Sequence, residues 1–426
     1  LAYDAWEQGR VAGAQMVALT EMFVTGYQTQ DLILKPAFVA HAERAVTALA
    51  ARIVDGPALG IGAPHMKDGL LYNAYYILEG GKVALVMIVH HAYVDGVGAG
   101  WLMKQIYKPL PDDHTENYPH WMPEPYPSWF RRLYTSVRDL PGFLISSMPK
   151  VVSGLRKKIA MEKALKLSGK PAHPAFNMMH KTPINVVLSP GRTFVCETIP
   201  LSRLVAISKH FKVTINDVFG SCTAGALRRL LLSMGHDANA RPLIAATPFA
   251  SERPEGMEGL GNFATLDYCW SHSEIEDPLE RLMATREANI AMKEHLAEVK
   301  AAGADLNALM GVLPNWAIRL ARYWIQSKKG SIGVFGNLIM SNVPGPKEPL
   351  YLEKWKVDNW FSTGQIADGT ALNMTLWSYA GKANLCILAD RAVLADGWVL
   401  FNYFLEEIDA LEGLVSKAAG IQERNA

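Results

Sequence analysis

Apolar runs of strand length alternate with longer amphipathic stretches over most of this chain. A short apolar run bounded by turn residues predicts a buried strand, whereas apolar positions that recur at helical spacing predict a helix. The patterns predict strands at 16–19, 59–63, 70–78, 83–89, 194–200, 242–248 and within 338–346 and 371–393, and helices at 36–54, 201–211, 213–231, 277–292, 306–325 and 398–414. Strands and helices that recur in this way are typical of an α/β protein.

Turn residues predict two β-hairpins in this pattern. The sequence Glu79-Gly80-Gly81-Lys82 separates the two predicted strands 70–78 and 83–89, and Gly381-Lys382 lies inside the run 371–393. Tight hairpin turns require positive φ angles, which glycine adopts without a steric penalty. We therefore expect antiparallel pairing across both turns.

Composition limits the class of protein. The chain has 426 residues, of which 50% are hydrophobic and 19% charged, so it is globular and long enough for two domains. A net charge of +1 gives no general case for nucleic-acid binding. No apolar run reaches the roughly 18–20 residues of a membrane span. The start carries no signal-peptide pattern, and since it is Leu1 rather than a methionine, an upstream piece can be missing.

The cysteines indicate a reducing compartment. Cys196, Cys222, Cys269 and Cys386 are scattered, without the paired spacing of a zinc site. We therefore expect reduced, buried thiols, no cysteine-based metal site and a cytoplasmic protein.

The stretch 83–101, VALVMIVHHAYVDGVGAGW, places polar residues at the end of a predicted buried strand. His90 and His91 follow the strand directly, and Asp95 and a series of glycines precede the next apolar residues, which suit a helix. Imidazole has an unperturbed pKa of about 6.5 and therefore exchanges protons readily near neutral pH. This stretch is the strongest candidate for a proton-transfer site.

A purely structural interpretation of the same residues is a satisfied core histidine and an aspartate that caps the next helix. The spacing weakens that interpretation. Asp95 follows His91 by four residues, and Gly96 and the later glycines let the backbone approach a ligand closely.

The stretch HHAYVDG fits the HHxxxDG motif of CoA-dependent acyltransferases, and its context resembles the bacterial wax ester synthase/diacylglycerol acyltransferase family. Further matches to that family are NDV at 216–218, DPLERL at 277–282, SNVPGP at 341–346 and the run 371–393. The resemblance covers about residues 84–426. It implies a two-domain acyltransferase-like fold, with mixed sheets flanked by helices.

The resemblance also implies a reaction and its residues. The family moves a fatty acyl group from acyl-CoA to a long-chain alcohol or to diacylglycerol, with no metal or redox cofactor. His91 would be the general base and Asp95 the second motif residue, holding the loop rather than touching substrate. The supporting residues would be His90, Gly96, Asn216 and Asp217. Arg253 is a weaker candidate, as a partner of Asp95.

The role of the segment 213–231 has two interpretations. Thr214 or Asn216 can cap the predicted helix, and Asp217 is favourable at its positive end. Capping alone would explain Asn216, whereas the family resemblance places it beside the active site, where it would orient His91 or stabilise an oxyanion.

Residues 1–83 resemble a different family, the nitrilase-like glutaminase domain of bacterial NAD synthetase. The segments VALTEMFVTGYQTQDLILKPAF and LGIGAPHMKDGLLYNAYYILEGGKV carry this resemblance. Glu21 would be the general base of a Glu–Lys–Cys triad, but no cysteine precedes Cys196. A base cannot replace the missing thiol nucleophile, so we predict no amidase activity, and glutamine hydrolysis by this chain would contradict the prediction.

The chain therefore resembles a chimera with four segments: a nitrilase-like αβ fragment at 1–83, the acyltransferase motif region at 84–127, a basic amphipathic crossover at 128–190 and a C-terminal acyltransferase domain at 191–426. The PLW triplet that usually precedes the family's motif is absent. Because the triplet is absent, the alternative interpretation is a catalytically impaired chimera that acts at most as a lipid-surface binding module.

The segment 128–170 has two interpretations. Its aromatic and aliphatic residues are interleaved with Arg131, Arg132, Arg138, Lys150, Arg156, Lys157, Lys158, Lys163 and Lys166. Such a stretch can lie on an anionic membrane or lipid-droplet surface. The alternative is a crossover helix with a solvated basic face.

Overall fold

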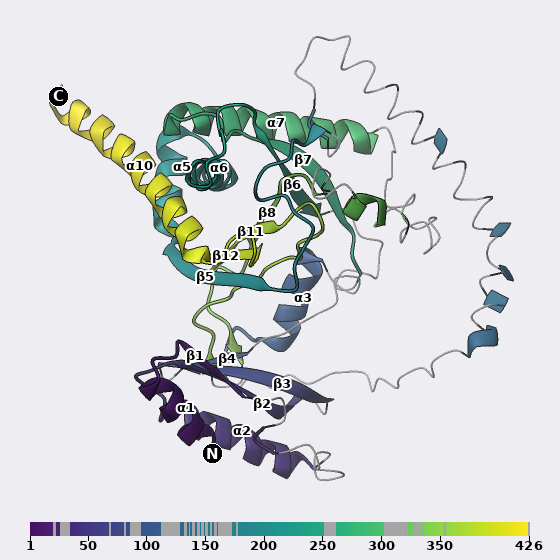
Figure 1. Ribbon diagram of the computed structural model, residues 1–426, viewed down its shortest axis with the longest axis vertical. Helices are drawn as coiled ribbons and strands as arrows, with labels where there is room; N and C mark the ends of the chain where they lie inside the picture. The colour runs from purple at the N-terminus through teal and green to yellow at the C-terminus, as the bar shows by residue number, and fades with distance from the viewer. Residues whose placement is uncertain are drawn as a thin grey trace. The chain divides into compact units, whose positions relative to one another are not determined.

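The computed structural model describes residues 1–19, 23–25, 35–67, 70–80, 82–85, 95–111, 173–175, 178–250, 261–301, 323–327, 335–352 and 355–424, with residues 320 and 333 and scattered residues between 128 and 160. The chain divides into two compact units, Leu1–Tyr93 and Val94–Ala426 (Figure 1). No helix in the described ranges combines the length and the apolar character needed to cross a membrane.

The first unit is a small α/β layer. Its sheet has the order β1-β2-β3-β4, with a parallel β1–β2 pair and antiparallel neighbours beyond it. The elements are α1 (Ala2–Val11), β1 (Met16–Ala18), α2 (Pro36–Ala50), β2 (Ala58–Lys67), β3 (Leu70–Glu79) and β4 (Lys82–Leu85).

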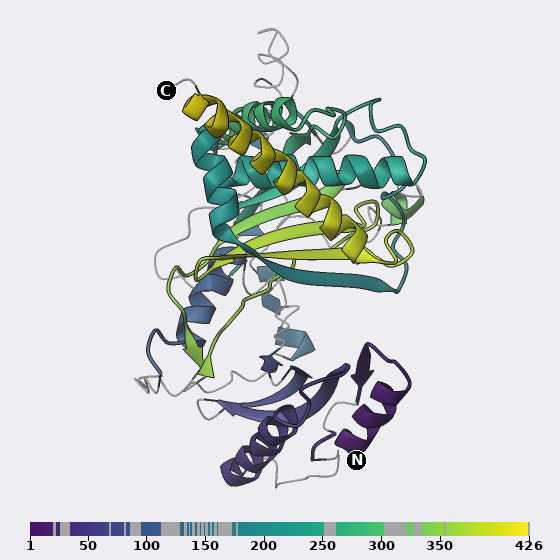
Figure 2. The same cartoon turned by 90° about the vertical axis from the view of Figure 1, so that its left-hand side faces the viewer.

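Both helices of this unit cover the same face of the sheet (Figure 2). Leu59 and Ile61 of β2 alternate inward and pack with Val46 of α2 and Trp6 of α1, all buried. The indole N–H of Trp6 donates to the Pro57 carbonyl over 2.7 Å, which fixes α1 to the loop before β2.

The second unit is built on a six-stranded mixed sheet with the order β5-β12-β11-β8-β6-β7. The pairs β11–β8 and β8–β6 are parallel, and the other neighbours are antiparallel. The strands are β5 (Arg192–Pro200), β6 (Leu243–Ala250), β7 (Ala264–Ser271), β8 (Leu338–Pro344), β11 (Leu372–Tyr379) and β12 (Lys382–Asp390), and a separate two-stranded ribbon joins β9 (Tyr351–Leu352) and β10 (Trp355–Lys356).

Four helices cover one face of this sheet (Figure 2). They are α5 (Leu201–Phe211), α6 (Ile215–Ser233), α7 (Pro278–Ala301) and α10 (Gly397–Arg424). Alternate residues of the strands, such as Leu376 of β11 and Leu385 of β12, pack with Phe219 of α6 and Phe404 of α10 in the main core.

Helix α3 (Gly96–Ile106) packs against the other face of the same sheet. Trp377 and Tyr379 alternate with the core residues of β11 and therefore point away from the four-helix layer. They form a second buried cluster with Met103 of α3 and Tyr107. The helix that follows the HHAYVDG motif is thus held on the face opposite to α5, α6, α7 and α10.

Most of the predicted elements are confirmed, with shifted ends. Both hairpins form, with Glu79 paired to Lys82 and Tyr379 to Lys382, so the second turn is Ala380-Gly381 rather than Gly381-Lys382. Helix α2 ends at Ala50 rather than at 54, and α7 runs to Ala301 rather than to 292. The strand at 83–89 is described only to Leu85, and most of the helix at 306–325 lies outside the described residues.

Two strands were wrongly predicted. Strand β7 was missed, because its buried positions include Asp267 and Ser271 and so lack an apolar alternation. Strand β2 runs on to Lys67 rather than ending at 63. Pro64 is accommodated there because β1 pairs with β2 only at Ala58–Gly60, so Pro64 needs no N–H on that side.

Candidate active site

Asp95 ends the HHAYVDG motif and begins helix α3. Its backbone is extended, and its Oδ1 accepts the N–H of Gly98 over 2.9 Å, the geometry of an N-cap. The residue is only 4% exposed. Its carboxylate therefore fixes the loop at the point where the motif turns into the helix.

The second carboxylate oxygen of Asp95 reaches a different part of the chain. Oδ2 accepts the N–H of Phe263 over 2.8 Å, and Phe263 directly precedes strand β7. One buried side chain thus ties the start of α3 to the start of β7, 168 residues later in the sequence. A buried carboxylate that accepts backbone N–H groups in this way is rigidly held.

Gly96 lies beside the end of strand β8. A Cβ atom built on Gly96 would lie 3.8 Å from Cγ2 of Val343, an ordinary contact distance. Val343 belongs to the SNVPGP segment at the end of β8. Three segments therefore lie close together in the structure: the end of the HHAYVDG motif, the start of β7 and the SNVPGP segment.

Four of the predicted residues lie outside the described part of the chain. These are His90 and His91 of the motif, Glu21 and Arg253. Their roles, and the pairing of Arg253 with Asp95, stay predictions.

Asp217 lies at the start of α6 and is part of a capping box. The N–H of Thr214 donates to Oδ2 of Asp217 over 2.7 Å, and the N–H of Asp217 donates to Oγ1 of Thr214 over 3.2 Å. Thr214, and not Asn216, is therefore the cap of this helix. Burial of Asp217 at the positive end of α6 agrees with the predicted dipole interaction.

Asp217 also connects α6 to α7 and β7. The Nδ2 group of Asn289 donates to Oδ1 of Asp217 over 2.7 Å, and the thiol of Cys269 contacts Oδ1 of Asn289 at 3.4 Å. Burial raises the pKa of Cys269 to about 12, so its thiol stays protonated as a donor. This chain of polar contacts holds the start of α6.

Asn216 is half-buried in the first turn of α6. Its side chain makes no hydrogen bond within the described ranges, in contrast to its neighbour Asp217. Capping does not use its amide, which leaves the amide for another partner.

Two residues that organise this region were not predicted from the sequence. Phe263 contributes through its backbone N–H, which no side-chain pattern can reveal. Asn289 had a visible signal, because it lies on the buried stripe of α7 with Leu282, Thr285 and Met292. A polar residue on such a stripe predicts a buried hydrogen-bond partner.

The predicted burial of the cysteines is confirmed for three of the four and wrong for Cys196. All four are free thiols, with Cys222, Cys269 and Cys386 buried and Cys196 half-buried. Burial raises the pKa of Cys386 to about 12, so this thiol is not a nucleophile at neutral pH.

Comparison with known families gives two matches within this chain. Residues 76–219 match the wax ester synthase/diacylglycerol acyltransferase catalytic domain, and residues 261–412 match the C-terminal domain of the same family. The first match contains the HHAYVDG motif and NDV, and the second contains Phe263, β7 and SNVPGP.

Individual relatives agree with these matches. A Mycobacterium tuberculosis protein described as a candidate diacylglycerol O-acyltransferase is 41% identical over 346 residues, 80% of this chain and 72% of that protein. The O-acyltransferase WSD of Acinetobacter baylyi is 28% identical over 370 residues, 82% of this chain and 74% of that protein.

A solved structure shows the fold. The wax ester synthase/diacylglycerol acyltransferase from Marinobacter aquaeolei VT8 matches 87% of this chain and 75% of its own with a TM-score of 0.52 at 20% identity. The predicted α/β acyltransferase-like fold is thereby confirmed.

A short segment is similar to another protein. The glutamine-dependent NAD(+) synthetase of Rhodobacter capsulatus is 55% identical over 96 residues, 22% of this chain and 17% of that protein. The acyltransferase match begins only at residue 76. The predicted combination of two unrelated families in one chain is supported by these two findings.

Proposed function

Since the chain belongs to the wax ester synthase/diacylglycerol acyltransferase family, we propose that His91 is the general base of an acyl transfer from acyl-CoA to the hydroxyl group of a long-chain alcohol or diacylglycerol. The chain is an acyl-CoA-dependent O-acyltransferase.

In the proposed reaction, His91 removes the proton of the acceptor hydroxyl while its oxygen attacks the thioester carbonyl carbon. The tetrahedral intermediate then expels the CoA sulfur, and the imidazolium of His91 returns the proton to the leaving thiolate. The new C–O bond replaces the C–S bond, so acyl ester and free CoA leave the site. General-base catalysis of this kind contributes about 10²–10⁴ to the rate.

The anchoring of Asp95 carries the proposal. A general base must be held within hydrogen-bond reach of the proton that it removes. Asp95 lies four residues after His91 and is buried with one oxygen on Gly98 and the other on Phe263. It is therefore a positioning residue that fixes the end of the histidine-bearing loop, and Gly96 starts the helix beside Val343.

The other predicted residues support His91 in this proposal. Asn216 offers an amide donor, unused in the described part of the chain, that can orient His91 or stabilise the oxyanion. Asp217 keeps the first turn of α6 in place through Thr214 and Asn289. His90 supports His91 from the neighbouring position, and acyl-CoA enters as a substrate, so the reaction needs no cofactor.

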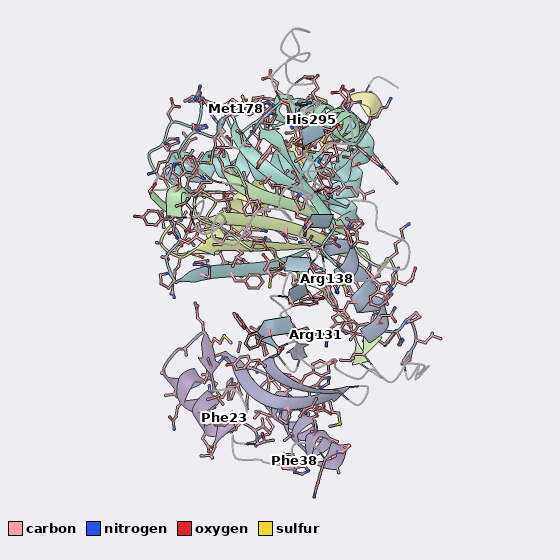
Figure 3. All side chains as sticks on the ribbon, turned by 90° about the vertical axis from the view of Figure 1, so that its right-hand side faces the viewer. Phe23, Phe38, Arg131, Arg138, Met178 and His295 are labelled. Atoms are coloured by element: carbon pink, nitrogen blue, oxygen red, sulfur yellow. The ribbon has the colours of Figure 1, made fainter. Side chains whose placement is uncertain are left out.

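We also propose that the protein works in the cytoplasm at a lipid surface. Trp129, Phe130, Tyr134 and Ile145 are 60%, 75%, 65% and 77% exposed, respectively. They share the segment 128–170 with Arg131 and Arg138, which are labelled in Figure 3. Exposed aromatic residues beside cationic ones favour the interface of an anionic membrane or lipid droplet.

Release of free CoA tests the proposed reaction. The wild-type chain with palmitoyl-CoA should release CoA only when hexadecanol or a diacylglycerol is added. The acceptor that gives the faster release shows whether the site prefers a single-chain alcohol or the bulkier diacylglycerol. CoA release that is independent of any acceptor would indicate hydrolysis instead, and no release at all would favour the catalytically impaired chimera.

Co-sedimentation with anionic vesicles tests the proposed lipid surface separately. The double variant Trp129→Ser with Phe130→Ser should bind these vesicles more weakly than the wild type.

A further inference from the structure

Three side chains outside the acyl-transfer site converge on one point of the second unit. Nε2 of His173 lies 2.8 Å from Oδ1 of Asp267, and Nδ1 of His295 lies 2.9 Å from Oδ2 of the same carboxylate. The two imidazole rings stack, with centroids 3.7 Å apart and planes inclined by 16°. The donor atoms of all three residues lie within 4.8 Å of one another.

These residues come from three separate parts of the chain. Asp267 is on the edge strand β7, His295 is on α7, and His173 lies in the segment that precedes β5. His173 and Asp267 are 94 residues apart and Asp267 and His295 are 28 residues apart, so no local motif marks the cluster. Figure 3 labels His295 in the helical layer of the second unit.

The three side chains are largely but not completely buried. The side chain of Asp267 is 8% exposed, and those of His173 and His295 are 16% and 15% exposed. Burial alone would raise the pKa of Asp267, but the hydrogen bonds from His173 and His295 outweigh it and hold the pKa at about 2. The carboxylate is therefore ionised at neutral pH and available as a charged ligand.

We propose that His173, Asp267 and His295 form a binding site for a divalent transition-metal ion of the zinc class. Two imidazole nitrogens and one carboxylate oxygen are donors that such ions prefer. The chain supplies three donors, and a water molecule would complete a four-coordinate site. The acyl transfer does not use this ion, and the site does not depend on the proposed function.

Coordination requires the two rings to leave their stacked arrangement. A metal ion lies in the plane of each imidazole that binds it, about 2.0–2.1 Å from the nitrogen, whereas these two planes are inclined by only 16° with centroids 3.7 Å apart. At least one ring must therefore turn before both nitrogens can face one ion. Each coordinating nitrogen must also offer its lone pair to the ion, which a neutral imidazole does when the other ring nitrogen carries the proton.

A bound ion would fasten an edge strand that matters for the acyl-transfer site. Strand β7 lies at the edge of the six-stranded sheet and pairs with β6. Its first residues follow Phe263, whose N–H holds Asp95. An ion on Asp267 would link β7 to α7 and to the segment of His173, and so restrain the strand next to that anchor.

Metal titration of the full chain tests the site. After treatment with a chelator, the protein is titrated with Zn²⁺ by calorimetry and with Co²⁺ by visible absorption at pH 7.5. We expect one equivalent of metal and a Co²⁺ spectrum typical of four-coordination. Zn²⁺ should also raise the melting temperature, because it binds the native state.

Variants assign the binding to these residues. His173→Ala and Asp267→Asn should each weaken binding by at least about tenfold and remove the rise in melting temperature. His173 lies outside every helix and strand, so its substitution should leave the fold intact even if that of Asp267 does not. His272→Ala is the matched control, because His272 is another half-buried histidine, paired to Glu274 at 2.8 Å.

The outcomes are distinct. Stoichiometric binding that His173→Ala removes and His272→Ala preserves supports the metal site. If the wild-type chain binds no metal, or if His173→Ala binds as well as wild type, the cluster is a hydrogen-bonded contact only and the proposal is wrong.

Discussion

At the scale of single residues, Asp95 shows how one side chain can connect two elements that are distant in sequence. Each carboxylate oxygen accepts a backbone N–H, one from its own helix and one from the residue before β7. Because Asp95 is buried, removal of its carboxylate would leave these N–H groups without their acceptor where water has little access.

We expect Asp95→Ala to lower the free energy of unfolding by about 2–3 kcal/mol, because it removes an N-cap and leaves the N–H of Phe263 unsatisfied. Asp95→Asn should lower the free energy of unfolding by less, since the amide oxygen of asparagine replaces one of the two carboxylate acceptors. Urea unfolding followed by circular dichroism measures both. Asp396→Ala is the control, because exposed Asp396 directly precedes α10 and, among the described residues, accepts one N–H, that of Trp398 in the first turn. Equal losses in Asp95→Ala and Asp396→Ala would contradict the anchoring role.

Asp390 predicts a specific pH dependence. Burial alone would raise its pKa, but hydrogen bonds from Ser189 and Ala392 and the charge of Arg192 outweigh burial and lower the pKa. The unfolded value is about 3.9, so the ionised carboxylate stabilises the fold above that pH and loses this effect as the pH falls through the lower folded value. The stability difference between wild type and Asp390→Asn should therefore be constant near pH 5–7 and should shrink below about pH 4. A difference that does not change with pH would contradict this account.

At the scale of elements, β7 and α7 connect the motif region to the start of α6. Phe263 before β7 holds Asp95, while Cys269 on β7 and Asn289 on α7 lead to Asp217 on α6. The two predicted segments HHAYVDG and NDV are thus attached to the same strand–helix pair, through Asp95 and Asp217.

A double-mutant cycle measures the contact between α6 and α7. Asp217→Ala and Asn289→Ala should show a coupling energy of about 1–2 kcal/mol, because they share one buried hydrogen bond to a charged group. Ser233→Ala combined with Asn289→Ala should be additive, because Ser233 lies at the far end of α6. Additivity of the first pair, within about 0.5 kcal/mol, would show that the contact does not couple the helices.

The sequence predicts elements best where local chemistry decides them. Glycine predicts both hairpin turns, and Gly80 and Gly381 adopt positive φ angles of 54° and 78° there. Thr214, one of the two predicted caps of α6, is its actual N-cap. Strand β7 could not be predicted, because its buried positions include the polar residues Asp267 and Ser271, and the partners of Asp267 lie far away in sequence. The bond from Asp95 to the backbone of Phe263 is hidden from sequence for the same reason.

At the scale of the whole molecule, the chain combines an acyltransferase with a segment similar to a different family. The second unit contains Asp95, α6, β7 and SNVPGP, and it carries the six-stranded sheet. The family matches begin at residue 76, within strand β3 of the first unit. The chemistry proposed here therefore depends on residues of the acyltransferase part, and no step uses the part similar to NAD synthetase.

The most direct test of this account is the rate of CoA release from palmitoyl-CoA and hexadecanol by wild type, His91→Ala and His90→Ala at equal protein concentration. The account predicts that His91→Ala lowers the acceptor-dependent rate by about 10²–10⁴, the share that a general base contributes. His90→Ala should retain a measurable part of the wild-type rate, because it only supports its neighbour. A His91→Ala variant that releases CoA at the wild-type rate would contradict the assignment of the site.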